Sequence, residues 1–317
     1  MAGKQKFDRK LADLQALRDQ GKSEAAREAL RMALGDKNNF VVSKAALLAG
    51  ELGEQGLFPE LAGAFDRFLE DGAKTDPQCY AKNAIAQVLK DFEYEDPELY
   101  VRGLRHRQPE PVYGGQQDTA ATLRATCAHA LLICRSISDL KILGHLTDLL
   151  SDSEHTVRLE AARAIAALGR PEGALLLRLK IACGDGRSEV TGQCMSALLA
   201  LDAEGGMAVV GRYLNGAGDD ADLPYEAAAA LGESREPAGF ELLRERYERP
   251  ADPHFRKVLL LSMGASLLPE AVDFLLSLIR ADQGQRARDA IAALEPARYR
   301  EEVRVRVEEA IRNAFPD

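Results

Sequence analysis

Apolar residues along the chain recur with the spacing of amphipathic helices, and short turn signals separate the runs. The clearest stretch is residues 150–186, LSDSEHTVRLEAARAIAALGRPEGALLLRLKIACGDG. Its first helix is predicted from apolar positions spaced i, i+4, i+8, namely Val157, Ala161, Ala162, Ile165 and Leu168. Gly169 predicts the left-handed cap that ends this helix, and Pro171 the first turn of the next. The second helix is expected to bury Leu175, Leu176 and Leu179 and to stop at Gly184.

The same punctuation recurs along the chain, which indicates an internal repeat. The closing apolar positions of successive first helices are Leu52, Leu89, Cys134, Leu168, Leu201, Leu231, Ser266 and Leu294. They are 28 to 45 residues apart, which is the range of helical-hairpin repeats. We therefore predict about eight helical hairpins stacked in one array over residues 1–317. Residues 1–35 would form an N-terminal capping pair, 36–295 the repeats, and 296–317 a C-terminal capping helix.

Composition supports an all-α solenoid. The chain has 50 Ala and 45 Leu among 317 residues and no Trp, so a β-rich fold is disfavoured. Each hairpin buries only one face by itself and needs its neighbours to complete the core. Small residues are expected where helices approach closely, and the candidates are the pairs Ala45-Ala46, Ala161-Ala162 and Ala227-Ala228.

The segment VRLEAARAIAALGRPEGALLLRL (157–179) resembles a HEAT-type repeat, particularly the bacterial subtype first described in phycobilin lyases. In that family an Asp before the second helix and an Arg early within it pair between adjacent repeats as a ladder. Asp152 and Arg158 stand in those places, and Asp252 with Arg256 is a looser match. Thr191 takes the Arg place in the following repeat, so the ladder is expected to break there.

The resemblance also implies a right-handed superhelical solenoid and a binding face. In the family the second helix of each hairpin lines the concave surface, so its outward positions would meet a partner. In register with Glu160 and Arg163, these positions are Lys44 and Leu47, Thr126 and His129, Gln193 and Ser196, Val258 and Leu261, and Arg286 and Asp289. Their mixed chemistry suits a protein or peptide better than a phosphate backbone. The alternative is an ordinary solvated face, on which Glu160 and Arg163 pair along their helix.

The longest break in helical periodicity is HRQPEPVYGGQQD (106–118). Its prolines and glycines preclude a helix, and a long loop in a compact array is often functional. Tyr113 beside two glycines is a candidate contact point for a partner. The alternative is a tolerated insertion without a role.

Net charge and the lack of targeting signals argue against a nucleic-acid-binding, secreted or membrane-spanning protein. The net charge is −9 and no segment is strongly basic, so nucleic acid is an unlikely partner. MAGKQKFDRK lacks the apolar core of a signal peptide, and no apolar run is long enough to cross a bilayer. We expect a cytoplasmic, soluble protein.

The five cysteines are expected to be buried in apolar helices, without disulfides: Cys79, Cys127, Cys134, Cys183 and Cys194. Cys127, His129 and Cys134 do not suit a tetrahedral metal site, because on a helix His129 points about 160° away from Cys127. Two acidic runs, 91–98 and 218–222, are interpreted as helix caps and solvated turns, with Asp96 capping a helix that begins at Pro97.

The chain carries no motif of a serine hydrolase, P-loop, zinc protease or dinucleotide-binding protein. We therefore expect a non-enzymatic scaffold that binds a protein or peptide, without cofactor or metal. Two alternatives remain: a lyase-like or chaperone role with a linear tetrapyrrole, and a HEAT-like alkylpurine DNA glycosylase. The glycosylase requires a basic, aromatic-rich groove that the predicted face does not supply.

Overall fold

Helices form almost all of the secondary structure in the computed structural model, which describes residues 2–315. The fold is an all-α solenoid. It divides into two compact units, residues 1–168 and 169–317, and each is described by itself. The prediction of one continuous domain stays a prediction. Residue 1 of the predicted N-terminal cap and residues 316–317 of the predicted closing segment lie outside the described residues.

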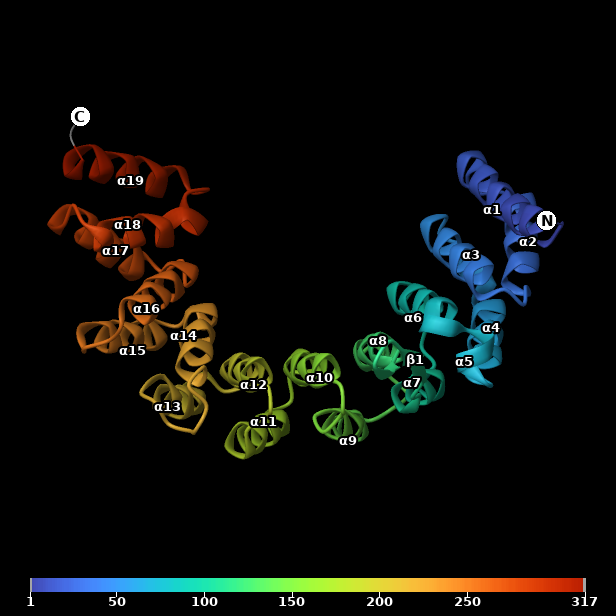
Figure 1. The fold of residues 1–317 in the computed structure, drawn as a ribbon, viewed down its shortest axis with the longest axis horizontal. Helices are drawn as coiled ribbons and strands as arrows, with labels where there is room; N and C mark the ends of the chain where they lie inside the picture. The colour runs from blue at the N-terminus through green and yellow to red at the C-terminus, as the bar shows by residue number, and fades with distance from the viewer. Residues whose placement is uncertain (1, 316–317) are drawn as a thin grey trace. The chain divides into compact units, whose positions relative to one another are not determined.

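Unit 1 begins with the helices α1 and α2, where the capping pair is predicted, and continues as alternating helices in two layers (Figure 1). Its elements are α1 (Ala2–Gln20), α2 (Glu24–Leu34), α3 (Asn39–Glu51), η1 (Gln55–Leu57), α4 (Phe58–Leu69), α5 (Gly72–Thr75), η2 (Pro77–Cys79), α6 (Tyr80–Asp91), α7 (Pro97–Arg105), β1 (Pro109–Val112), β2 (Gly115–Asp118), α8 (Ala121–Leu131), α9 (Asp139–Leu149) and α10 (His155–Leu168). We call α3, α6, α8 and α10, which pack in succession, layer A. Helices α4, α7 and α9 form layer B.

Unit 2 repeats the alternation. Its elements are α11 (Pro171–Cys183), α12 (Ser188–Leu201), α13 (Ala203–Leu214), α14 (Leu223–Ser234), α15 (Pro237–Glu248), α16 (Pro253–Ala265), α17 (Pro269–Ala281), α18 (Gln285–Leu294), η3 (Glu295–Ala297) and α19 (Glu301–Ala314). Helices α12, α14, α16 and α18 pack in succession and form layer A of this unit. Layer B contains α11, α13, α15, α17 and α19.

Small residues lie where layer A helices approach each other most closely. A Cβ added at Gly264 in α16 would lie 1.9 Å from the carbonyl oxygen of Ala293 in α18. One added at Gly232 in α14 would lie 2.3 Å from the Ser262 oxygen in α16. The three predicted alanine pairs are fully buried, as expected for small residues in close-packed helices.

The predicted helix boundaries around residue 170 are confirmed. Gly169 has φ +70°, the left-handed conformation that a residue with a side chain adopts only at a cost, and Pro171 is the first residue of α11. Asp96 also caps α7 as predicted, because its carboxylate accepts the Leu99 N–H at 2.9 Å.

Two burial predictions for this region are wrong. Leu175 and Leu179 are 69% and 63% exposed, and α11 instead buries Ala174, Leu177 and Ile181. The apolar run ALLLRL contains two possible apolar helix faces, so its pattern alone does not determine which face is buried. The Cys183 thiol is exposed, whereas the other four cysteines are buried as expected.

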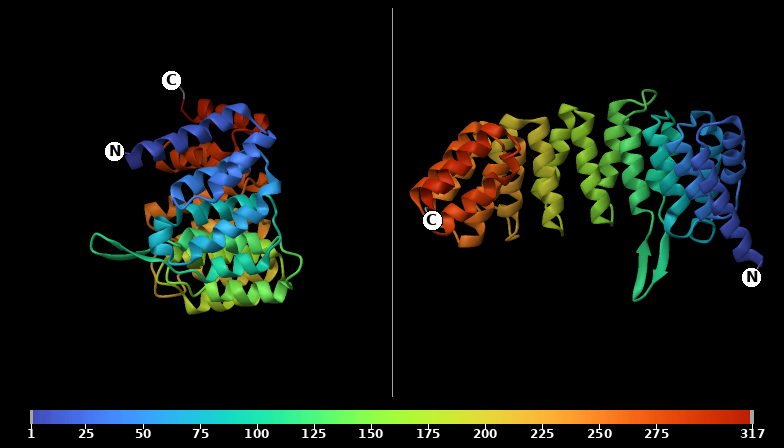
Figure 2. Two further views of the ribbon diagram at one scale, coloured as in Figure 1. Left: turned by 90° about the vertical axis from the view of Figure 1, so that its right-hand side faces the viewer. Right: turned by 90° about the horizontal axis from the view of Figure 1, so that it is seen from above.

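The segment 106–118 is not helical, as predicted, but it contains a structure that its sequence did not lead us to expect. Strands β1 and β2 form an antiparallel hairpin, the one sheet in residues 2–315. Both views in Figure 2 show the hairpin extending away from the helices of unit 1.

Candidate functional site

The hairpin presents an aromatic side chain at its tip. Val112 pairs with Gly115, so only Tyr113 and Gly114 form the turn, and Gly114 has the positive φ, +90°, that a type II turn needs at its second central residue. Tyr113 is fully exposed, at 108% of its reference area, and Val112 is 41% exposed. The tip is therefore an apolar and aromatic surface held away from the core.

The base of the hairpin is anchored by a buried carboxylate. Glu110 in β1 points inward and is only 6% exposed. Its Oε1 accepts hydrogen bonds from the Gln78 N–H at 2.7 Å, the Gln108 amide at 2.6 Å and the Thr119 hydroxyl at 2.7 Å. Its Oε2 accepts from the Gln78 side chain at 3.1 Å. Burial alone would raise the pKa of Glu110, but these hydrogen bonds together hold it below its ordinary value.

Glu110 also fixes a strained turn in the preceding repeat. Gln78 and Cys79 have φ values of +61° and +53°, a left-handed conformation that costs roughly 1–2 kcal/mol for a residue with a side chain. The hydrogen bonds from Gln78 to Glu110 stabilise this conformation. The hairpin and the start of α6 are thus held in one fixed arrangement.

A buried ion pair supports the same turn. Lys82 and Asp76 are both fully buried, and the Lys82 Nζ lies 3.1 Å from an Asp76 oxygen and donates to the Phe68 carbonyl at 2.9 Å. Asp76 also accepts the Ala81 and Lys82 N–H groups at 2.9 and 3.0 Å. Both charges are satisfied, as buried charges must be.

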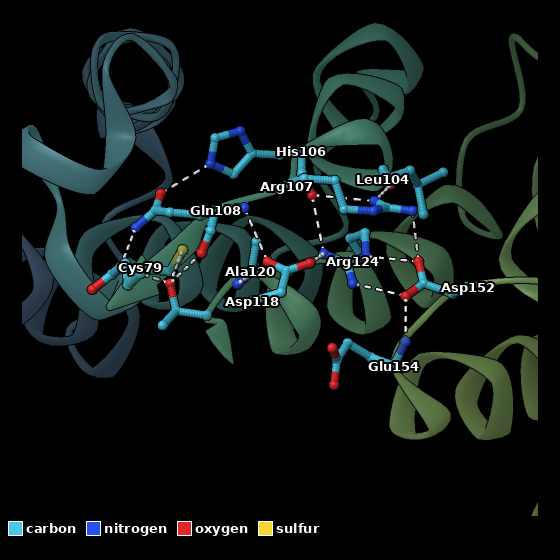
Figure 3. A network of polar contacts seen from close by, with 12 residues as sticks. Cys79, Leu104, His106, Arg107, Gln108, Asp118, Ala120, Arg124, Asp152 and Glu154 are labelled. Carbon is cyan, nitrogen blue, oxygen red and sulfur yellow. Dashed lines mark hydrogen bonds and ion pairs between the residues drawn. The ribbon is translucent and has the colours of Figure 1, made fainter. Parts of the chain in front are cut away.

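The other side of the hairpin base is held by Arg124 of α8 (Figure 3). Its guanidinium binds both oxygens of Asp152, at 2.9 and 2.8 Å, and one oxygen of Asp118 at 2.7 Å. Arg107 donates to Asp152 at 2.6 Å, and the Glu154 N–H donates to it at 2.9 Å. Asp118, the last residue of β2, accepts the Gln108 and Ala120 N–H groups at 2.9 and 3.0 Å.

The predicted ladder residues lie next to this network. Asp152 is its central acceptor, bound by an Arg from the preceding repeat. The Arg158 guanidinium donates to the carbonyl oxygens of Asp152 and Ser153, at 2.7 and 3.0 Å. Sequence reasoning missed Arg124, although a signal was present: Arg124 precedes Arg158 by 34 residues, which is also the separation of Cys134 and Leu168 in the repeat alignment.

The network is suited to anchoring and not to nucleophilic chemistry. Burial raises the pKa of the Cys79 thiol to about 11, so at neutral pH it is protonated and a poor nucleophile. Burial also lowers the pKa of His106, whose Nε2 lies 3.0 Å from the Gln108 side-chain oxygen. A neutral His106 then donates to Gln108, which in turn donates to Glu110.

The predicted binding face is a set of surface positions on layer A. In unit 1, the His129 Nε2 of α8 lies 2.9 Å from the Glu160 carboxylate of α10, and Arg163 pairs with the same carboxylate at 2.5 Å. These three predicted residues therefore form one cluster. Lys44 lies elsewhere on α3, with its Nζ 5.3 Å from the centre of the Phe40 ring. In unit 2, Gln193 is half-buried and Arg286 is exposed, on α12 and α18.

An apolar groove of about 250 Å³ lies between α1 and α3. It is lined by Leu11, Leu14, Leu47 and Leu48, with the Arg18–Glu51 ion pair at its rim. Within residues 2–315, no three His, Cys, Asp or Glu side chains converge in a way that could hold a metal ion. None of the helices described is long and apolar enough to span a bilayer.

Residues 214–295, from the end of α13 to η3, match the HEAT repeats family. Residues 214–295 carry HEAT repeats. The match agrees in family with the resemblance drawn from residues 157–179, and it lies farther along the chain, within unit 2. No curated protein matches the chain at a significant level.

Several solved structures resemble the chain over most of its length. A chain in the complex of CpcE and CpcF of phycocyanin lyase from Nostoc sp. PCC7120 is 18% identical, with 78% of this chain and 94% of that chain covered and a TM-score of 0.39. Human deoxyhypusine hydroxylase in complex with glycerol is 18% identical, with coverage of 81% and 89% and a TM-score of 0.32. An engineered protein is 16% identical, with coverage of 96% and 95% and a TM-score of 0.39. At these identities and TM-scores, none of the similarities carries information about activity or ligands.

Proposed function

We propose that this HEAT-repeat protein is a non-enzymatic scaffold that binds a protein partner, and that the hairpin 109–118 is a contact arm. The observation that carries the proposal is the combination of a fully exposed Tyr113 at the tip with a fully buried polar anchor at the base. Tyrosine is a frequent anchor of protein interfaces because it buries a large rigid surface at a low cost in conformational entropy.

The cost of the anchor supports a role for the arm. Burying Glu110, Asp76, Lys82 and Arg124 requires that each be removed from water and rebonded, which contributes little net stability compared with an apolar core. A tolerated insertion would need neither the buried Glu110 carboxylate nor the contact between Arg124 and Asp118. Their arrangement restricts the hairpin to one orientation, and a pre-oriented arm loses less entropy on binding.

Layer A of unit 1 is the second part of the proposed contact surface. The His129–Glu160–Arg163 cluster offers a donor, an acceptor and a cation within one small area, while Leu47 and the leucine groove offer an apolar area. A polypeptide can match both kinds of surface, because interfaces combine an apolar centre with a polar rim.

Site-specific photo-crosslinking tests the proposal. A photoreactive phenylalanine analogue replaces Tyr113 in one variant and Tyr299 in a matched control, since Tyr299 is also an exposed aromatic residue, at 73%. In cells that normally make the protein, position 113 is expected to give a discrete protein adduct and position 299 is not. Equal, diffuse labelling at the two positions would show that the arm is not a contact.

The two alternatives predicted from the repeat type are open to direct test with the same purified protein. An absorbance shift on mixing with a linear tetrapyrrole would favour the lyase-like role. Tight binding of duplex DNA at low salt would favour the glycosylase, because phosphate contacts dominate such affinity. The scaffold proposal expects neither.

A further inference from the structure

We propose that the outer edge of β2 binds the same edge of a second copy of the chain, so that two hairpins form a four-stranded antiparallel sheet. This inference rests on the proposed role of the hairpin as a contact arm and names the partner that the arm takes. The pairing would centre on Gln116.

The register of the hairpin determines which main-chain groups face outward. Val112 pairs with Gly115 across a two-residue turn, and Glu110 pairs with Gln117. Pairs next to a two-residue turn exchange hydrogen bonds, and hydrogen-bonded pairs alternate with pairs whose N–H and C=O groups point away from the partner strand. The outward-facing pairs are therefore Pro111 with Gln116 and Pro109 with Asp118.

The two edges of the hairpin differ in what they offer. Both outward positions of β1 are prolines, which have no N–H to donate, so this edge is closed to another strand. On β2, Gln116 keeps both its N–H and its C=O. The sheet in the described residues has two strands, so no third strand covers this edge. Gly115, Gln116 and Gln117 are all exposed.

A second copy suits this edge for two reasons. Antiparallel pairing of β2 with itself is two-fold symmetric, so each Gln116 can donate to and accept from its counterpart. Residues 115–117 carry no charge, so the pairing brings no like charges together along the shared edge. Asp118, the nearest charge, is held by Arg124.

The prolines also explain why the assembly would stop at two chains. After β2 pairs with β2, the sheet has β1 on both outer edges, and both are closed by Pro109 and Pro111. An edge strand without such protection is prone to open-ended association. Because the shared edge is only four residues long, the dimer is expected to be weak and reversible with concentration.

Sedimentation of the purified full-length chain over a concentration series tests the inference. The wild-type protein is expected to change reversibly from monomer to dimer. Gln116→Pro removes the outward N–H and should remain monomeric, whereas Gln116→Ala keeps the main chain and should dimerise like the wild type. Pro111→Ala restores an N–H on the outer edge of β1 and should add species larger than a dimer.

The hairpin should remain folded in Gln116→Pro, because a proline is already accommodated directly opposite, at Pro111. Hydrogen exchange at the Gln117 N–H checks this. A wild-type protein that stays monomeric up to its solubility limit overturns the inference, and so does dimerisation that survives Gln116→Pro with the hairpin intact. Failure of the self-pairing can be distinguished from failure of the contact arm. A crosslinked adduct at position 113 with a different protein would support the proposed function even if the chain does not pair with itself.

Discussion

Arg124 binds both carboxylate oxygens of Asp152 across two adjacent repeats, and neither side chain is exposed to solvent. The pair joins α8 to the turn that precedes α10. The third guanidinium nitrogen reaches Asp118 at the end of the hairpin. One arginine therefore connects the stacking of two repeats to the position of the proposed contact arm.

Removing one member of this pair should be strongly destabilising. Asp152→Ala leaves the Arg124 guanidinium buried without its main partner and also removes an acceptor for Arg107. The expected loss is about 3–5 kcal/mol in the free energy of unfolding, the usual cost of breaking a buried ion pair from one side. Urea denaturation followed by circular dichroism measures it.

A matched control is Glu160→Ala, which removes a half-buried ion pair on layer A and should cost about 1 kcal/mol or less. If Asp152→Ala costs no more than Glu160→Ala, the buried pair does not contribute as argued here. The double variant Arg124→Met with Asp152→Leu should recover part of the loss, because it removes both charges of the fully buried pair, while Asp118 keeps its two main-chain donors.

Acid should loosen the hairpin base before the rest of unit 1. Hydrogen bonds hold the pKa of Glu110 below its ordinary value against the effect of burial, and the same balance lowers the pKa of Asp118. A carboxylate with a lowered folded pKa stabilises the fold fully above its unfolded pKa, and this contribution disappears as the pH falls through the folded pKa. The protection of the Gln108 and Gln78 N–H groups against hydrogen exchange should therefore fall below about pH 4.

Glu110→Gln tests the origin of this acid sensitivity. The variant should lose about 1–3 kcal/mol of stability at neutral pH, the range for a hydrogen-bonded charged group, and should show a flatter dependence between neutral and acidic pH. A variant with the same acid profile as the wild type would assign the effect to other carboxylates.

Glu226 in α14 should show the opposite behaviour. Burial, followed by the charges of Glu189, Asp222, Glu233 and Asp220, raises the pKa of Glu226. The folded state then holds its proton at a higher pH than the unfolded state, so ionised Glu226 opposes folding above its raised pKa. Lowering the pH through that value removes the opposition.

Glu226→Gln is accordingly expected to stabilise the protein at neutral pH by about 0.3 kcal/mol or more, the scale of like-charge repulsion on helices. The gain should shrink in acid. Thermal unfolding at two pH values measures both effects. The control is Glu241→Gln, which removes an exposed partner of Arg244 and should give no gain.

The repeat architecture could be predicted from the sequence because packing in a solenoid is periodic. Gly169, Pro171 and the buried alanine pairs meet local requirements, and similar signals recur in several of the hairpins, so their spacing identified the helices. The buried face of α11 could not be assigned in the same way, since five of the six residues in ALLLRL are apolar and only the neighbouring helices determine which of them are covered.

The anchor of the hairpin depends on contacts that no local pattern contains. Glu110 meets Gln78 across 32 residues, and Arg124 meets Asp152 across 28. The prolines and glycines of segment 106–118 indicated only that a helix is absent. Which charges converge beneath the segment follows from the stacking of α6 and α8, and therefore appears only in the folded chain.

The close approach of layer A helices can be tested by comparing two Gly→Ala variants that gain the same helix propensity. Gly264 in α16 and Gly63 in α4 are both helical, so replacing either by Ala gains about 0.5–1 kcal/mol of helix propensity. At Gly63 nothing lies within 4 Å of the new methyl group, and Gly63→Ala should stabilise the protein by about that amount.

At Gly264 the methyl would lie 1.9 Å from the Ala293 oxygen, so α16 and α18 must separate. Overpacking of this kind typically costs about 1–3 kcal/mol, so Gly264→Ala should be net destabilising. Equal shifts in the urea midpoint for the two variants would show that the layer A helices are not in the close contact on which the stacking of unit 2 depends.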